Sequence, residues 1–254
     1  MKDLLLKSGI EFDDSGFMKI PNWVKRVKID VGLSDGAPQS AKWLEQEAND
    51  LLVFGFEPNH ANAQNIRTRN SDWATTLHPK HINHKFYLIE CALADVEEMQ
   101  LQNFYHTAAD PGCSSLLQPK EFEVAEVVTV QTWSLNHFLK YFPFHQIPYI
   151  DFVKTDCQGS DIEVLRGCSQ FLNKIAVYTC EADDTRYHSS KNTLEALTQE
   201  FKRHRFFLYK NYMKNTSKVF GPRLKYIKTE DPTFINQGLR EKIAKNKVRA
   251  YQEG

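Results

Sequence analysis

The chain has 254 residues, of which 41% are hydrophobic and 25% are charged. This length suits a single domain over residues 1–254 that buries a full hydrophobic core. Basic and acidic residues number 32 each, so the net charge is zero, which excludes a global field that attracts nucleic acid or anionic membranes.

The cysteines and the N-terminus bear on the compartment. Five cysteines are scattered without a C-x-x-C pair, which favours a reducing cytosol over a disulfide framework. No apolar run approaches the ~20 residues that span a bilayer, and residues 1–10 lack the core of a signal peptide. We therefore expect a soluble, cytoplasmic protein with a lead-in (1–24), a core (25–228) and a C-terminal tail (229–254).

The first apolar strand is predicted at about residues 26–31, after an N-terminal helix that Pro21 ends. The strand finishes on Asp30, and a turn with Gly32 and Gly36 follows. Strand, glycine turn and helix N-terminus open a nucleotide-binding α/β unit, because a glycine lets the backbone approach a ligand closely.

The helix after this turn is predicted at about residues 39–49, with Ser40 as its candidate cap. Ser34 stands where a dinucleotide fingerprint has its second glycine, which argues against a dinucleotide. The acid Asp30 better suits a cofactor that carries an amino group, such as S-adenosylmethionine.

The second strand, at about 51–57, ends on Glu57, and a helix follows at about 59–70. An acid at the end of the neighbouring parallel strand reaches the ribose of a ligand bound at the first turn. Its two acceptor oxygens suit a vicinal diol.

The middle of the chain contains a third strand with its exit turn at 86–95. Alternating segments at 99–105 and 126–132 flank a loop at 106–119, and a helix is predicted at 133–142.

The fourth strand, at about 149–156, brings Lys154 and Asp156 to the same face because side chains alternate along a strand. Asp156 ends this strand at the crevice where ligands bind in such sheets. In the helix that follows, Ser160 and Glu163 match a capping box, and Gly167 is placed to close the helix.

The fifth strand, at 175–181, ends on Glu181. A helix at 190–203 and strands at 206–212 and 221–228 complete the chain. Alternating strands and helices predict a mostly parallel sheet with helices on both faces.

Three motifs then appear in order: IDVGLSDG at 29–36, FEPNH at 56–60 and DFVKTDCQGSDIEVLRG at 151–167. They resemble the VDVGANxG, FEPxP and DFIKIDVEGxExxVLxG motifs of the FkbM-type family of S-adenosylmethionine-dependent methyltransferases. The resemblance covers about residues 27–181, and its third motif is the most specific. This chain departs from the pattern at Leu33 and Ser34, at Gln158, where an acid is usual, and at Asp161, where Glu is usual.

The resemblance implies a Rossmann-like, seven-stranded sheet of the class I methyltransferase type with a small antiparallel insertion. It implies cofactor contacts to the methionine part from Asp30, Gly32, Leu33, Ser34 and Gly36, to the ribose from Glu57, and to the adenine from Ala92 and Asp95.

Asp156 is the leading catalytic candidate, with Lys154 and Glu181 beside it. Methyl transfer needs a group that holds the acceptor oxygen and removes its proton, and it needs no covalent intermediate, so Cys157 is not expected to be a nucleophile. Substrate contacts are expected from Ser114, Ser115, Gln158 and Asp183.

No metal site is predicted. His78, His81 and His84 are spaced as H-x-x-H-x-x-H, but Pro79 interrupts them and no cysteine or acid completes a ligand set. A divalent cation at Asp156 is compatible with the chemistry, but nothing in the sequence indicates one.

The predicted function is O-methylation of a sugar or glycan hydroxyl, or of a related natural product, in a small-molecule or glycan partner. We expect neither membrane nor nucleic-acid binding. Two alternatives stay open: an RNA ribose 2′-O-methyltransferase, and a nonenzymatic S-adenosylmethionine-binding domain. The chain is also compatible with one domain of a larger glycan-modifying protein.

Overall fold

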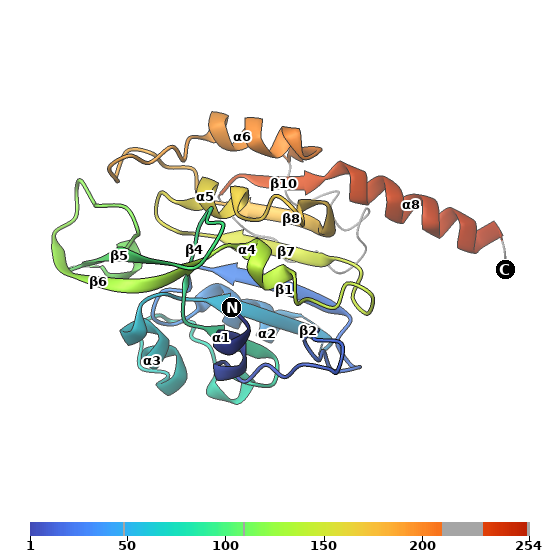
Figure 1. Cartoon of the computed structure of the whole chain (residues 1–254), viewed down its shortest axis with the longest axis horizontal. Coiled ribbons are helices and arrows are strands. Elements are labelled where there is room, and N and C mark those ends of the chain that lie inside the picture. Colours follow the sequence, from blue (N-terminus) through green and yellow to red (C-terminus); the bar gives the residue numbers. More distant parts are fainter. Residues whose placement is uncertain (48, 109, 210–230, 253–254) are drawn as a thin grey trace.

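A computed structural model describes residues 1–47, 49–108, 110–209 and 231–252. It contains a seven-stranded sheet of order β3-β2-β1-β7-β8-β10-β9 and a three-stranded sheet of order β4-β6-β5. The small sheet lies at one end of the large one, and the last helix, α8, extends from the other end (Figure 1).

The bounds of the elements are as follows. The large sheet consists of β1 (Arg26–Val31), β2 (Leu51–Phe56), β3 (Phe86–Ile89), β7 (Ile150–Thr155), β8 (Ile175–Cys180), β9 (Phe206–Leu208) and β10 (Thr233–Asn236). The small sheet consists of β4 (Ala92–Leu93), β5 (Gln100–Thr107) and β6 (Val124–Trp133). The helices are α1 (Lys2–Lys7), α2 (Pro38–Gln46), α3 (His60–Thr68), α4 (Leu135–Leu139), α5 (Asp161–Arg166), α6 (Leu194–Arg203) and α8 (Gln237–Gln252), with short 3-10 turns η1 (Pro79–His81), η2 (Pro111–Cys113) and η3 (Leu172–Lys174).

The direction of the strands identifies the fold class. The strands β3, β2, β1, β7 and β8 pair in parallel, and β10 is antiparallel to both β8 and β9. The chain builds outward from β1 to β3 and then crosses to β7, so strand order reverses between β1 and β7. With the antiparallel β5–β6 ladder, this confirms the predicted class I methyltransferase fold and places the ligand-binding switch point at β1 and β7.

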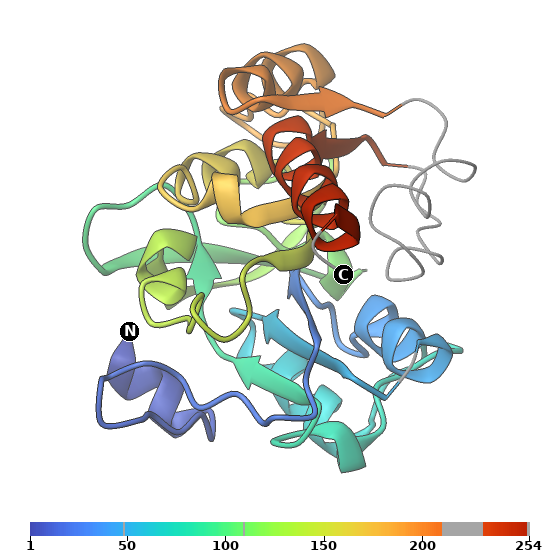
Figure 2. The same ribbon diagram turned by 90° about the vertical axis from the view of Figure 1, so that its right-hand side faces the viewer.

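Helices cover both faces of the large sheet, as predicted. Every residue of β1, β2 and β8 is buried, as expected for central parallel strands. One apolar cluster joins the sheet to α1, α4, α5 and α6, and the other joins it to α2, α3 and α8. Figure 2 shows α4 and α5 on one side of the sheet and α2 and α8 on the other.

A buried ionic cluster lies at the amino end of β1. Lys28 is 1% exposed, contacts Glu47 of the α2 end through its ammonium group, and lies 4.6 Å from the Trp43 ring centre. Arg26 Nη1 lies 2.7 Å from Glu47, and Asp50 accepts a second hydrogen bond from Arg26. Burial lowers the pKa of Lys28, which the Glu47 carboxylate opposes. These ion pairs connect the end of α2 to β1.

Two predicted helix caps are wrong. The N-cap of α2 is Ala37 in the left-handed region at φ 46°. Ser40 lies inside the helix, where its hydroxyl donates to Asp30 at 2.6 Å. Ser160 precedes α5 without the extended backbone that a capping side chain needs, so its hydroxyl donates to the Cys157 carbonyl at 3.1 Å. Glu163 pairs with Arg166 at 3.1 Å instead of completing a capping box.

Gly167 lies directly after α5 and caps its end, as predicted, with an amide that donates to the Glu163 carbonyl. Its φ is −63°, which any residue can adopt. A Cβ at this position would lie 2.3 Å from the Ala94 carbonyl oxygen, so a close approach between segments requires glycine here.

Several boundaries differ from the prediction. The N-terminal helix ends at Lys7, well before Pro21, and the helix predicted at 133–142 is limited to α4. The segment 86–95 divides into β3 of the large sheet and β4 of the small one. The strand predicted at 221–228 lies outside the described residues.

The range 229–254, predicted as a tail, contains β10 and α8. β10 lies between β8 and β9 in the sheet, and its four residues are all buried. With only four residues, two of them polar (Thr233 and Asn236), this strand is too short for its periodicity to identify it.

Candidate functional site

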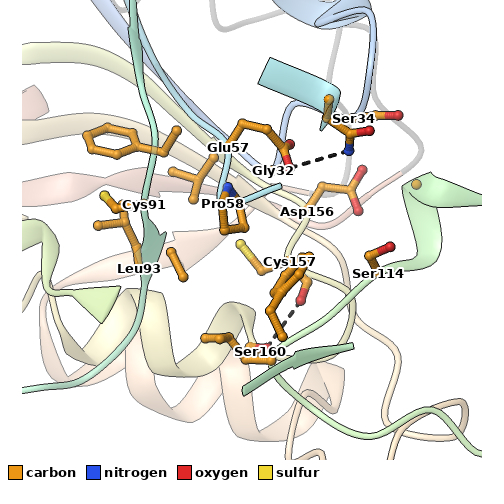
Figure 3. Close-up of a pocket in the computed structure, with 17 residues that line it drawn as sticks. Gly32, Ser34, Glu57, Pro58, Cys91, Leu93, Ser114, Asp156, Cys157 and Ser160 are labelled. Carbon is orange, nitrogen blue, oxygen red and sulfur yellow. Dashed lines mark hydrogen bonds between the residues drawn. The ribbon is translucent and has the colours of Figure 1, made fainter. Parts of the chain in front are cut away.

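A cleft opens at the carboxyl ends of β1, β2 and β7, at the switch point (Figure 3). It encloses about 590 Å³ of empty space, part of which is open to solvent. The large sheet contributes the loops after these strands. The small sheet contributes Ala92 and Phe104, and the loop between β5 and β6 contributes Leu116.

Gly32 allows two strand ends to meet beneath the cleft. Its φ is 77°, and a Cβ there would lie 2.0 Å from the Asp156 carbonyl oxygen. The Asp156 amide donates to the Val31 carbonyl at 3.0 Å. Only glycine satisfies both the backbone conformation and the close approach, so the turn after β1 is fixed against the turn after β7.

Glu57 faces the first turn from the end of β2, as predicted. Its carboxylate accepts hydrogen bonds from the Leu33 amide at 3.1 Å and from the Asn59 amide at 3.0 Å. Burial raises the pKa of Glu57 to about 7, against the opposing effect of these hydrogen bonds. The side chain borders the cleft and has the two acceptor oxygens that a ribose diol needs.

Asp30 lies one layer behind the cleft and does not line it. It is 1% exposed and accepts a hydrogen bond from Ser40, and burial raises its pKa, opposed chiefly by Lys154. The Lys154 ammonium lies 3.5 Å from Asp30 Oδ1. The contact of Asp30 with a methionine amino group therefore stays a prediction.

Lys154 joins the ends of β1 and β7. Its ammonium donates to the Gly32 carbonyl at 3.0 Å and lies 3.4 Å from Asp156 Oδ2. Burial acts to lower the pKa of Lys154, but the carboxylates of Asp156 and Asp30 outweigh it and hold the pKa above its ordinary value. The two carboxylates that pair with Lys154 are those of Asp156 and Asp30.

Asp156 presents a carboxylate to the cleft. Its side chain is 38% exposed, and it borders the cleft opposite Glu57 (Figure 3). One oxygen accepts a hydrogen bond from Gln158 Nε2 at 2.7 Å, and the other faces Lys154. An accessible anion held by two donors is suited to orient and deprotonate a hydroxyl.

Gln158 and Ser115 lie behind Asp156 instead of lining the cleft. Gln158 is in the left-handed region at φ 51°, and its carbonyl accepts a hydrogen bond from the Ser115 hydroxyl at 2.8 Å. Its side-chain oxygen accepts from the Tyr187 hydroxyl at 2.8 Å. Tyr187 was not predicted, because a single aromatic residue in a polar loop has no pattern that indicates a contact 29 residues away.

Glu181 and Asp183 form a separate cluster around Arg186 and do not line the cleft. Arg186 lies 2.6 Å from Glu181 and 2.5 Å from Asp183. Burial raises the pKa of Glu181 to about 7, with the charges of Asp156 and Asp161 adding to it. The Thr185 amide lowers the pKa of Asp183 to about 2. A direct role for either acid stays a prediction.

The predicted residues thus divide into two groups. Six border the cleft: Gly32, Ser34, Glu57, Ala92, Ser114 and Asp156. Leu33, Gly36 and Asp95 do not; Leu33 contributes its amide to Glu57, and Gly36 lies against the segment with Ser71 and Trp73. Wall residues that were not predicted include Asn62, Cys91, Leu93, Phe104 and Leu116. Most are apolar, and apolar wall residues have the same sequence pattern as core residues.

The structure also bears on metal binding and on membrane insertion. In residues 1–47, 49–108, 110–209 and 231–252, no group of three or more His, Cys, Asp or Glu side chains is placed to hold a metal ion. Among the helices of the described part of the chain, none has both the length and the apolar content needed to cross a membrane.

Comparison with known proteins places the chain in a family. The profile of the methyltransferase FkbM domain matches residues 30–220, and the chain therefore belongs to the FkbM family of methyltransferases. Among solved structures, a chain described as human methyltransferase 10 domain containing protein is similar to 92% of this chain and 89% of its own, with 11% identity and a TM-score of 0.33. No curated protein matches.

Proposed function

We propose that the protein is an S-adenosylmethionine-dependent O-methyltransferase that acts on a hydroxyl of a sugar, a glycan or a related natural product. The observation that carries the proposal is the placement of Glu57 and Asp156 on either side of the Gly32 turn, facing one cleft. Membership of a methyltransferase family supports the reaction class.

The residues present fit this cofactor. When bound, S-adenosylmethionine supplies an electrophilic methyl group on a sulfonium centre. Glu57 would accept the ribose hydroxyls, and the backbone of Gly32 and Ser34 would line the methionine part, because these residues border the cleft at the end of β1. The close approach at Gly32 leaves no room for a side chain on the side that faces Asp156.

Asp156 would act on the acceptor. Its carboxylate is accessible, and it contacts two donors, the Gln158 amide and the Lys154 ammonium. It would hold the acceptor hydroxyl within about 3 Å of the methyl carbon and take up the hydroxyl proton as the oxygen attacks.

The charge distribution supports a carbohydrate over RNA. The net charge is zero, whereas RNA binding typically draws on many phosphate contacts and weakens steeply with salt. The Lys154–Asp156 pair is the observation that keeps a ribose 2′-O-methyltransferase as the second candidate. The accessible Asp156 argues against a domain that only binds the cofactor.

Two measurements test the proposal. Calorimetry should show S-adenosylmethionine or its demethylated product binding in the micromolar range, roughly −7 to −8 kcal/mol. Transfer of labelled methyl groups to nucleotide sugars, glycans and short RNAs then identifies the acceptor class, with only a modest loss of rate at physiological salt. Methylation of RNA alone, abolished by moderate salt, would support the second candidate, and NAD binding without S-adenosylmethionine binding would overturn both.

A further inference from the structure

A buried hydrogen-bond chain leads from Asp156 to the loop of the small sheet. Gln158 joins Asp156 to Tyr187, which has no exposed surface. The Tyr187 hydroxyl lies 2.8 Å from two acceptors, the side-chain oxygen of Gln158 and the main-chain oxygen of Cys113. A hydroxyl has one proton, so it fully satisfies one acceptor at a time.

The orientation of the Gln158 amide depends on the charge of Asp156. An ionised carboxylate only accepts hydrogen bonds, so the amide nitrogen faces Asp156 and the amide oxygen takes the Tyr187 proton. A protonated Asp156 becomes a donor. The amide oxygen can then face Asp156, the nitrogen can donate to the Tyr187 oxygen, and Tyr187 can donate to the Cys113 carbonyl.

We propose that Tyr187 is a positioning residue that supports Asp156 in both protonation states by letting the Gln158 amide reverse. The proposal rests on the proposed function, in which Asp156 receives a proton during each turnover. The new bond joins the acceptor oxygen to the methyl carbon as the carbon–sulfur bond breaks. The hydroxyl proton passes to Asp156 Oδ1, which then donates to the reversed amide.

Contacts of the backbone hold the loop at Gln158 in place while the side-chain amide rotates. The Ser115 hydroxyl donates to the Gln158 carbonyl, and a Cβ at Gly159 would lie 3.0 Å from the Tyr187 ring. Reversal therefore needs only a half turn about the last side-chain bond, without movement of the loop.

Other charged groups also surround Asp156. Lys154 on the same strand, with Asp30 of β1 behind it, favours the ionised form. Asp161 of α5, which accepts from Asn192, and Glu181 after β8, which pairs with Arg186, disfavour it. None of these charged groups contacts the Gln158 amide in the way that Asp156 and Tyr187 do, so the change in amide orientation involves only Gln158 and its two partners.

Side-chain amide NMR tests the reversal without any acceptor substrate. In the wild-type protein, the Gln158 amide protons should gain nuclear Overhauser contacts to the Tyr187 ring as the pH is lowered. Asp156→Asn should abolish this pH dependence. A Gln158 amide that keeps the same contacts at every pH at which the protein stays folded would overturn the proposal and leave the methyltransferase assignment unaffected.

Kinetics supply the second readout. Tyr187→Phe should lower kcat about tenfold or more and leave KM for S-adenosylmethionine unchanged. The matched control is Tyr178→Phe, which removes an equally buried hydroxyl with no hydrogen-bond partner among the described residues; its kcat should stay at the wild-type value. A wild-type kcat and pH profile in Tyr187→Phe would contradict the proposal.

Discussion

The ionic clusters at the two ends of β1 differ in how their charges are exposed. At the amino end, Lys28 and Arg26 are buried with Glu47, and the Lys28 ammonium lies beside aromatic rings. At the carboxyl end, Lys154 lies between Asp30 and Asp156, and Asp156 is accessible from the cleft. The first cluster compensates its charges inside the protein, whereas the second leaves an anion available to a ligand.

The backbone shows the same contrast. Three residues at the carboxyl end are in the left-handed region: Gly32, Ser34 and Gln158 have φ values of 77°, 56° and 51°. Residues outside the favoured regions persist where the surrounding structure holds them, which is common at binding sites. We therefore expect the amino-end cluster to contribute to stability, and we propose the carboxyl-end cluster for ligand binding.

The largest expected effect on stability is at the amino end. Glu47→Ala would leave Lys28 buried without its carboxylate, so the free energy of unfolding should fall by roughly 3–5 kcal/mol. The matched control is Glu45→Ala on the exposed side of α2, which should change it by less than about 0.5 kcal/mol. Denaturant unfolding measures both. An Glu47→Ala variant as stable as the control would show that the amino-end cluster is not stabilising.

Asp156→Asn should have the largest effect on turnover. The change keeps the size of the side chain and removes its charge and basicity, so kcat should fall about 10²-fold or more. Cofactor affinity should change little. Asp14→Asn, at an exposed position near the N-terminus, should retain full activity. If Asp156→Asn turns over at the wild-type rate, the base must be sought at Glu181 or Asp183.

Glu57→Ala tests the carboxyl end of the sheet through its affinity for the cofactor. Loss of the charged hydrogen bonds to the ribose should weaken S-adenosylmethionine binding by about 1–3 kcal/mol, as measured by calorimetry. An unchanged affinity would exclude Glu57 from the cofactor site.

Glu57 also predicts a pH effect. Burial raises its pKa from the ordinary 4.5 to about 7, so the folded protein binds a proton that the unfolded chain has released between these values. The stabilisation from this proton is complete below pH 4.5 and is lost as the pH rises through about 7. Glu57→Gln should remove this part of the pH dependence, measured as the difference in unfolding free energy from wild type between pH 5 and 8.

Ser40→Ala should have the smallest effect. It removes the hydrogen bond to Asp30 but leaves Lys154 as a partner, so the free energy of unfolding should fall by only about 0.5–1.5 kcal/mol. Cofactor affinity should fall little, because Asp30 does not line the cleft. A large loss of affinity with unchanged stability would instead support a direct contact between Asp30 and the cofactor.

Local sequence patterns were sufficient to predict the fold class and the acids that end the strands. The apolar runs that end on Asp30, Glu57 and Asp156 are local patterns, and the carboxyl ends of parallel strands must meet at one edge. For that reason, the sequence pointed to Glu57 and Asp156 together, and both border the same cleft, while their roles in binding and catalysis stay predictions. The three motifs added the family, which the match over residues 30–220 confirms.

Which of these groups border the cleft and which lie behind it became clear from the contacts between distant segments. Asp30 and Gln158 lie behind the wall, and Tyr187 completes a chain that joins three distant segments. These roles depend on side-chain direction and on contacts between loops, and neither follows from residue spacing. The short strand β10 was also decided by tertiary structure, because its four buried residues are strand-forming only between β8 and β9.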